Sequence, residues 1–160
     1  AQVQSRARFR RQDLFETSLR EASVVTMYLL PEVNMRLRPR LLTELRPGTR
    51  IVSHNFTLGD WRPDAEREID ASRIYLWIVP HPVGGSWILE RADGTALPLE
   101  LQQRFQEVSG TLEGRPLENV RLRGRSLSFS AAGETFHGVV EDAVIVPDPA
   151  AAGWRARRAG

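Results

Sequence analysis

The stretch Ala22–Trp61 constrains the fold more than any other part of this chain, because it holds two apolar strands separated by a helix-length segment. Residues Ser23–Tyr28 hold Val24, Val25, Met27 and Tyr28 and no charged side chain, which is typical of a strand buried on both faces. Arg50–Ser53 is the second apolar run. A strand, a crossover helix and a second strand form a right-handed βαβ unit with parallel strands. The sequence therefore predicts an α/β arrangement here.

The segment between these strands has the pattern of an amphipathic helix. Pro31 can open it, because the N–H that proline lacks would be unpaired at a first helical position. Pro39 interrupts the pattern and predicts two short helices or a kink. Pro47-Gly48 ends the helix. One apolar stripe, repeating every four residues, is expected to face the sheet: Val33, Leu37, Leu41 and Leu45.

The remainder of the chain predicts mainly antiparallel strands. Residues 62–72 are highly charged and predict a loop or a short solvated helix, whereas Arg73–Pro80 predicts a strong strand. Gly84-Gly85-Ser86 then turns the chain into Trp87–Leu89. Five short alternating segments follow, with a turn signal between each, and they predict an antiparallel meander: 97–105, 117–124, 125–131, 134–140 and 143–147. Trp154 is expected to plug one end of the meander, with the last arginines trailing in water.

Composition narrows the class of protein. A chain of 160 residues with 41% hydrophobic and 26% charged residues is typical of one globular domain or slightly more. No apolar run could span a bilayer and no signal peptide is visible, so we expect no membrane association and a cytoplasmic location, unless an N-terminal signal has been lost. The lack of cysteine excludes disulfides and cysteine nucleophiles. His81, His137 and Glu141 show no ligand spacing, which predicts no metal site.

Several motifs of the first half together resemble class I S-adenosylmethionine-dependent methyltransferases. They follow the pattern DLF…YLLP…LRP.LL.EL.PGTRIVSH.F..GDW.PD. ARFRRQDLF resembles the third strand of that family, ASVVTMYLLP the fourth, and LLTELRPGTRIVS a helix, its turn and the fifth strand. The run is similar to a set of bacterial methyltransferases, which extends the likeness into the C-terminal region. More distantly it resembles protein-lysine methyltransferases that modify a subunit of ATP synthase.

The resemblance implies a fold and a division of the chain. We expect a partial Rossmann-like α/β methyltransferase sheet followed by an antiparallel β-meander, α+β overall. Residues 1–85 would be the partial methyltransferase region and residues 86–160 a meander or small barrel-like module. Arg73–Pro80 and Trp87–Leu89 would pair as the closing hairpin of the family's sheet. The glycine-rich cofactor loop of the family is absent from the sequence, so we expect the C-terminal portion of such an enzyme, which could be inactive by itself.

The same resemblance implies S-adenosylmethionine as the cofactor and suggests two residues that would bind its adenine. The Asp13 carboxylate would accept from the adenine amino group, and the backbone N–H of Leu14 would meet a ring nitrogen. The alternative for Asp13 is the cap of a helix or turn, a common place for this residue type. The preceding segment, with Val3, Ala7 and Phe9, would be a third strand without a neighbour. We expect it to be poorly ordered or to pair with a second copy of the chain, giving a homodimer.

Four residues are candidates for the catalytic side of the site. Tyr28 lies where the family's catalytic loop begins and could help a lysine substrate lose its proton, or it could be a buried tyrosine at a strand end. Ser53-His54 cannot be a nucleophile and base, because adjacent strand residues point to opposite faces. His54 still ends a parallel strand, where α/β sheets place ligands, although a capping or core role is the alternative. Asp60 and Trp61 would line the same pocket, with the indole over or beneath it.

Two functional hypotheses follow. The first is methyl transfer to a nitrogen or oxygen nucleophile, with a protein lysine as the substrate class that the resemblance suggests. The second is a non-catalytic module whose meander binds an apolar ligand or a protein partner, with the α/β part as a scaffold. A nucleic-acid surface is disfavoured, because Arg121, Arg123 and Arg125 alternate with Leu122 on an outer strand face and acidic residues lie among them.

Overall fold

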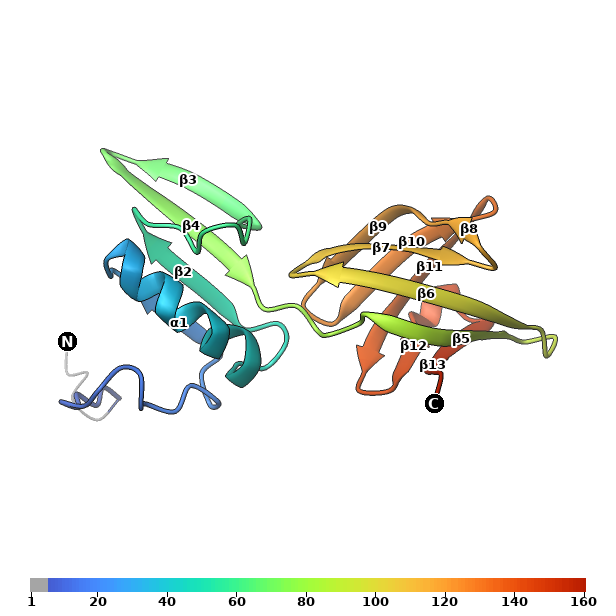
Figure 1. Cartoon of the computed structure of the whole chain (residues 1–160), viewed down its shortest axis with the longest axis horizontal. Coiled ribbons are helices and arrows are strands. Elements are labelled where there is room, and N and C mark those ends of the chain that lie inside the picture. Colours follow the sequence, from blue (N-terminus) through green and yellow to red (C-terminus); the bar gives the residue numbers. More distant parts are fainter. Residues whose placement is uncertain (1–5) are drawn as a thin grey trace.

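A computed structural model describes residues 6–160 of the chain, which form two sheets joined by a short linker (Figure 1). The first sheet has the strand order β1-β2-β4-β3, and the second has the order β8-β7-β6-β5-β13-β12-β11-β10-β9. No helix in the described residues is long and apolar enough to cross a membrane. The chain passes from the first sheet to the second between Ile78 and Gly85. The predicted division into domains at residue 85 stays a prediction.

The first sheet contains the predicted βαβ unit. Its elements are β1 (Val24–Met27), α1 (Pro31–Glu44), β2 (Arg50–His54), β3 (Ala65–Ile69) and β4 (Ser72–Ile78). β1 and β2 are parallel, whereas β4 runs antiparallel to both of its neighbours. The Rossmann-like arrangement is thus only partial, since a single pair of strands is parallel.

Helix α1 packs its apolar stripe against one face of this sheet. Leu37, Leu41 and Leu45 are 4% exposed or less, as the four-residue spacing predicted. The prediction of two short helices was wrong, because α1 continues through Pro39. Pro39 lies on the exposed side of the helix, where water can satisfy the carbonyl that the proline ring leaves unpaired. Burial of the stripe before and after Pro39 keeps the helix in one piece.

Strand β1 is not buried on both faces, which corrects that prediction. Val24 is 41% exposed and Thr26 is also exposed, whereas Met27 is buried. Among the described residues β1 is an edge strand, and α1 covers one face of the sheet only. The apolar run therefore indicated a strand correctly, but two-sided burial needs a covering layer that lies outside the strand itself.

Two further predictions about the first sheet were wrong. Residues 62–72 form no helix: Ala65–Ile69 is the edge strand β3, which pairs with β4 and is exposed throughout. A tight turn at Asp70, with φ of 55°, joins the two strands, so pairing decides the structure of this charged segment. The predicted hairpin of Arg73–Pro80 with Trp87–Leu89 does not form. These segments belong to different sheets, and β4 pairs instead with β2 and β3.

The described N-terminal residues form no strand. Phe9 is 95% exposed, and residues 6–23 contain only turns and irregular backbone. Val3, which the predicted third strand included, lies outside the described residues. Residues 13–17 lie beside α1, where the Arg40 guanidinium donates to the carbonyls of Leu14 and Thr17 at 3.1 and 2.7 Å.

The second sheet is antiparallel throughout and curls on itself, since β9 at one end of the order also lies against β7. Its strands are β5 (Gly85–Arg91), β6 (Ala96–Arg104), β7 (Glu107–Leu112), β8 (Arg115–Pro116), β9 (Glu118–Arg123), β10 (Ser126–Ala131), β11 (Glu134–Glu141), β12 (Val144–Pro147) and β13 (Trp154–Arg158), with a 3₁₀ turn at Pro149–Ala151. Five of them correspond to the predicted alternating segments. Leu122 is buried and its arginine neighbours are exposed, as predicted.

Strand β7 was not predicted, and the prediction that the last arginines trail in water was wrong. β7 contains Gly110, where a Cβ atom would lie 2.0 Å from the Glu100 carbonyl oxygen, so two strands approach there more closely than another side chain allows. Arg155 and Arg158 do not trail in water. β13 pairs between β5 and β12, Arg155 bonds to Glu90, and Arg158 donates to the carbonyl of Pro82 at 2.9 Å.

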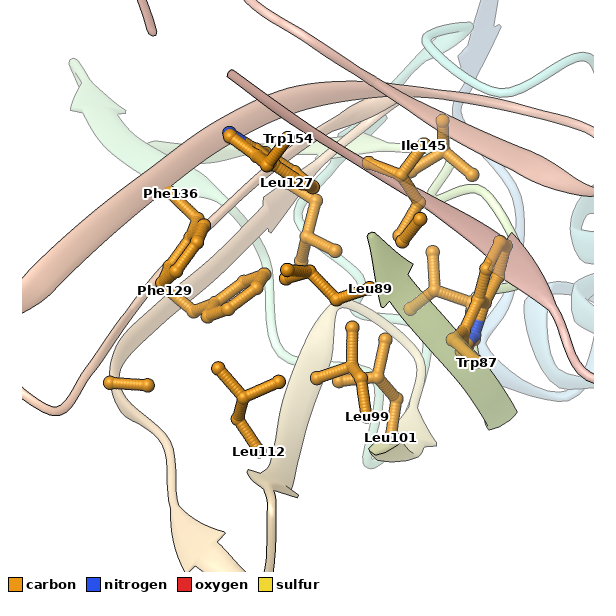
Figure 2. Packing of buried hydrophobic residues seen from close by; sticks show 14 of the residues in the cluster. Trp87, Leu89, Leu99, Leu101, Leu112, Leu127, Phe129, Phe136, Ile145 and Trp154 are labelled. Atoms are coloured by element: carbon orange, nitrogen blue, oxygen red, sulfur yellow. The ribbon is translucent and has the colours of Figure 1, made fainter. Parts of the chain in front are cut away.

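Side chains fill the interior of the second sheet (Figure 2). Phe129 stacks on Phe136 with ring centroids 4.9 Å apart, and the edge of Trp154 meets both rings. Trp87 and Leu89 from β5 are fully buried in the same cluster. Trp154 therefore contributes to the core as predicted, within a paired strand rather than as a loose plug.

Candidate functional site

Tyr28 and His54 meet at the end of the parallel strand pair. Tyr28 follows β1 directly, and His54 is the last residue of β2. Their ring centroids are 4.3 Å apart and the ring planes lie at 73°, an edge-to-face contact. Parallel strands bring their carboxyl ends to one edge of a sheet, which is where open α/β sheets bind ligands. The structure therefore brings together two of the four predicted catalytic residues.

An open pocket of about 460 Å³ lies beside this pair, on the sheet face that α1 does not cover. Tyr28 is 72% exposed, so the alternative of a buried strand-end tyrosine was wrong. His54 is half-buried, and its Nδ1 atom is buried without a hydrogen-bond partner. The pocket is mostly apolar and is lined by Thr26, Met27, Tyr28, Val52, His54 and Ile74. The rings of Tyr28 and His54 are therefore the two side chains of this pocket that a polar group of a ligand could contact.

Ser53 points to the opposite face from His54, as the strand period requires. It is fully buried, and its hydroxyl donates to the Phe56 carbonyl at 2.7 Å. The Asn34 amide from α1 reaches the same place and donates to the carbonyls of Phe56 and Thr57 at 3.4 and 3.2 Å. This network anchors the loop that leaves β2 at His54.

Asn34 was not predicted from the sequence, although it is 0% exposed. A signal was present: Asn34 precedes Leu37 by three residues and Leu41 by seven, which places it on the buried side of α1. A fully buried polar side chain needs hydrogen-bond partners; the loop carbonyls provide them for the Asn34 Nδ2, whereas its Oδ1 is buried without a partner.

Asp60 and Trp61 do not line the Tyr28 pocket. Asp60 pairs with the guanidinium groups of Arg38 and Arg104, and the hydrogen bond from Arg38 is the main reason that the pKa of Asp60 lies below its usual value. Trp61 is 0% exposed, so its indole packs beneath the loop rather than over a pocket. The Trp61 Nε1 donates to the Gln106 side chain at 2.8 Å.

The two predicted cofactor residues lie elsewhere on the surface of the first sheet. The Asp13 carboxylate accepts from the backbone N–H of Phe15 at 2.7 Å, which is the local turn described by the alternative interpretation. The Leu14 carbonyl accepts from Arg40. Neither residue lines the Tyr28 pocket. Their assignment to a cofactor stays a prediction.

Comparison with known proteins places the N-terminal part of the chain in a family context. Residues 1–65 match the model of the ANTKMT methyltransferase domain. A protein-lysine N-methyltransferase of Saccharolobus islandicus (strain REY15A) is 40% identical over 81 residues, 48% of this chain and 50% of the relative. The mouse adenine nucleotide translocase lysine N-methyltransferase is 35% identical over 71 residues, 44% of this chain and 31% of the relative.

The chain is a distant relative of the ANTKMT-type methyltransferases. The resemblance inferred from the sequence motifs is thereby confirmed. The chain is also similar to a solved RNA methyltransferase of Salinibacter ruber in complex with S-adenosyl-L-homocysteine. The match is 48% identical, covers 47% of this chain and 49% of the solved chain, and has a TM-score of 0.46.

The chain spans half or less of the length of these two lysine methyltransferases. The residues matched by the family model contain β1, α1 and β2 with Tyr28 and His54, and they end just after Trp61, at Ala65. The second sheet lies entirely beyond the matched residues.

Proposed function

We propose that this chain contributes the methyl-accepting side of an S-adenosylmethionine-dependent methyltransferase whose substrate is a protein lysine. The names of the two curated relatives support lysine as the acceptor. One observation carries the proposal: Tyr28 and His54 face a common pocket at the carboxyl ends of β1 and β2, within the residues that match the methyltransferase model.

Methyl transfer is an in-line displacement, in which the bond from carbon to the sulfonium sulfur breaks as the bond from carbon to nitrogen forms. The protein mainly positions the nucleophile and removes its water. A lysine ammonium must also lose a proton before it can attack. The exposed Tyr28 ring can hold the ammonium by a cation–π contact, and the imidazole of His54, which lines the same pocket, can accept its proton. The apolar walls of Val52 and Ile74 favour the neutral amine.

The residues of this chain fit only part of the cofactor. S-adenosylmethionine supplies the methyl group as an electrophile, and its adenine would be held by Asp13 and Leu14. One carboxylate oxygen of Asp13 already accepts from the Phe15 N–H, and the side chain is exposed. No glycine-rich loop for the rest of the cofactor is present in the sequence. The roles proposed above for Tyr28 and His54 concern the acceptor and do not depend on how the cofactor is held.

Two measurements test the proposal. Calorimetric titration with S-adenosylhomocysteine should give binding that Asp13→Ala weakens. Transfer of a labelled methyl group to lysine-containing proteins should fall by about 100-fold or more in His54→Ala, the usual effect of removing a general base. His137→Ala is the matched control, because His137 is exposed on β11 of the second sheet. Equal transfer by both histidine variants would refute the role of His54, and no binding or transfer by the parent chain would refute the proposal.

The alternative of an apolar-ligand module receives no support from the interior of the second sheet. Its inward side chains are buried and occupy the space themselves; Trp87, Leu99 and Phe129 are 1% exposed or less. A ligand there would have to displace packed side chains. Binding of a protein partner, homodimer formation and a cytoplasmic location stay predictions.

A further inference from the structure

The turn between β6 and β7 reaches from the second sheet onto the loop that follows β2. Phe105 stacks on Trp61 with ring centroids 5.7 Å apart and planes at 17°, and it packs against the core of the first sheet. Gln106 bonds twice to the same loop. Its Oε1 accepts from the Trp61 Nε1 at 2.8 Å, and its Nε2 donates to the Arg62 carbonyl at 2.6 Å. The turn therefore fixes both the side chain and the backbone of the loop.

Ion pairs also join the loop after β2 to the second sheet. Asp60 is shared by Arg38 of α1 and Arg104 of β6, so one carboxylate joins the two parts of the molecule. Both guanidinium groups also lie over the Phe105 ring, at 5.5 and 5.7 Å from its centroid. An aromatic ring between two cations and an indole is a specific arrangement rather than a general apolar contact.

The backbone of Phe105 gives independent support. This residue is the first of a two-residue hairpin turn and has a φ of 56°, a conformation in which glycine is favoured. Several described residues that are not glycine have a positive φ, and Phe105 is the only aromatic one among them. A bulky side chain is unfavourable in this conformation. The contact of its ring with Trp61 accounts for a phenylalanine at this position.

The loop is also held on its other side, by α1. Asn34 bonds to the carbonyls of Phe56 and Thr57, and Arg38 donates to the Leu58 carbonyl at 3.0 Å. Helix α1 thus secures the first half of the loop, next to His54. The second half, Asp60–Arg62, is bonded from both sides, by Arg38 and the Trp77 indole and by Arg104 and Gln106 at the end of β6 and in the turn after it.

We propose that Arg104, Phe105 and Gln106 are positioning residues, which hold the loop 55–64 and through it the end of β2 at His54. The relevance to methyl transfer rests on the proposed function, whereas the mechanical role does not. The turn lies beyond the residues that match the methyltransferase model, and the loop lies within them. The second sheet is thereby assigned a function: it completes the support of a methyltransferase loop.

Hydrogen exchange of the backbone amides, followed by mass spectrometry on the full chain, tests this role. In Phe105→Gly, which removes the ring at a position where glycine is favoured, amides in 55–64 should exchange about tenfold faster, while β9–β11 keep their protection. Gln106→Met, which keeps the side-chain volume, should accelerate the same amides by a similar factor. Phe105→Tyr keeps the ring and should restore slow exchange.

Glu113→Gly is the matched control, since Glu113 is also the first residue of a two-residue turn with positive φ, between β7 and β8. It should leave the loop unchanged. Unchanged exchange of 55–64 in Phe105→Gly would overturn the proposal. If Phe105→Gly instead unfolds the whole chain, Gln106→Met decides: slow loop exchange there would equally overturn it. A parent chain that transfers no methyl group would refute the proposed function and leave this exchange result intact.

Discussion

The two sheets of this molecule reach a buried core in different ways. The second sheet is antiparallel and curled, so its inner side chains bury one another, and the cluster around Phe129 needs no other element. The first sheet buries one face under α1, while Val52 and Ile74 on its other face stay half-exposed. A sheet with a parallel pair normally has a layer on both faces, whereas an antiparallel sheet can be complete with one. The first sheet therefore depends more on contacts from outside its own strands.

The junction shows the same dependence. The core of the first sheet includes Phe105 from the β6–β7 turn, whereas among residues 6–160 the core of the second sheet takes none from before Val83. The sheet that carries the candidate site thus takes part of its core from the β6–β7 turn. Three substitutions test this difference: one in the core of the second sheet, one in the helix that covers the first sheet, and one at the junction between them.

Removing a ring from the self-contained core should have the largest effect. Phe129→Ala deletes a side chain that is 1% exposed and packed on Phe136 and Trp154, so it should lower the free energy of unfolding by about 3–5 kcal/mol. Urea denaturation gives the value. Val139→Ala is the control on the neighbouring strand β11, because Val139 is 40% exposed, and it should change the free energy by about 0.5 kcal/mol or less. A loss below about 1 kcal/mol for Phe129→Ala would show that this core is not tightly packed.

Loss of the buried amide of α1 should have an intermediate effect, confined to the first sheet. Asn34→Ala leaves the Phe56 and Thr57 carbonyls without this donor and should cost about 1–3 kcal/mol. Amides of β1 and β2 should lose exchange protection while those of β10 keep it. Thr43→Ala, an exposed change on the same helix, should cost about 0.5 kcal/mol or less. Equal loss of protection in both sheets would mean that they unfold as one unit.

The junction carboxylate should have the smallest effect, with a defined pH dependence. Arg38 lowers the pKa of Asp60 in the folded protein. Such a carboxylate contributes stability above its unfolded-state pKa of about 3.9, and the contribution is lost as the pH falls through the lower folded-state pKa. The parent should therefore exceed Asp60→Asn in urea midpoint at pH 7 and 5, and the two should converge towards pH 3 and below.

Asp142→Asn provides the comparison for this experiment. Asp142 lies in the exposed β11–β12 turn of the second sheet. The difference in urea midpoint between the parent and Asp142→Asn should not disappear over the same pH range. A gap between parent and Asp60→Asn that stays constant from pH 7 to pH 3 would contradict the role of the ion pairs of Asp60.

Local patterns were sufficient where the neighbours in sequence are also the neighbours in space. The stripe of Leu37, Leu41 and Leu45 predicted the buried side of α1, and strict alternation predicted most strands of the second sheet, with Leu122 inside and its arginines outside. Tyr28 and His54 were each predicted at the end of a parallel strand, and they meet in the structure because such strands end at a common edge. These inferences depend only on the period of a helix or strand and on the topology of a βαβ unit.

Partners far apart in the sequence were not predictable in the same way. Residues 65–69 have the charge of a solvated loop, yet pairing with β4 makes them a strand. No strand was predicted at 107–112, yet Gly110 lets β7 approach β6 closely. Trp61 was expected near a ligand, but it is buried in the core of the first sheet, where Gln106 accepts from its indole from 45 residues away. In each case the deciding atoms belong to a distant segment.

The sequence by itself determined the βαβ unit, the antiparallel character of the second half and the methyltransferase relationship of the first, because periodicity, turn residues and motif order are local properties. Only the tertiary structure decided which face of the first sheet stays open, which sheet β4 joins, and that Arg104, Phe105 and Gln106 hold the loop after His54. These features arise from burial and hydrogen bonding between segments that are brought together only when the chain folds.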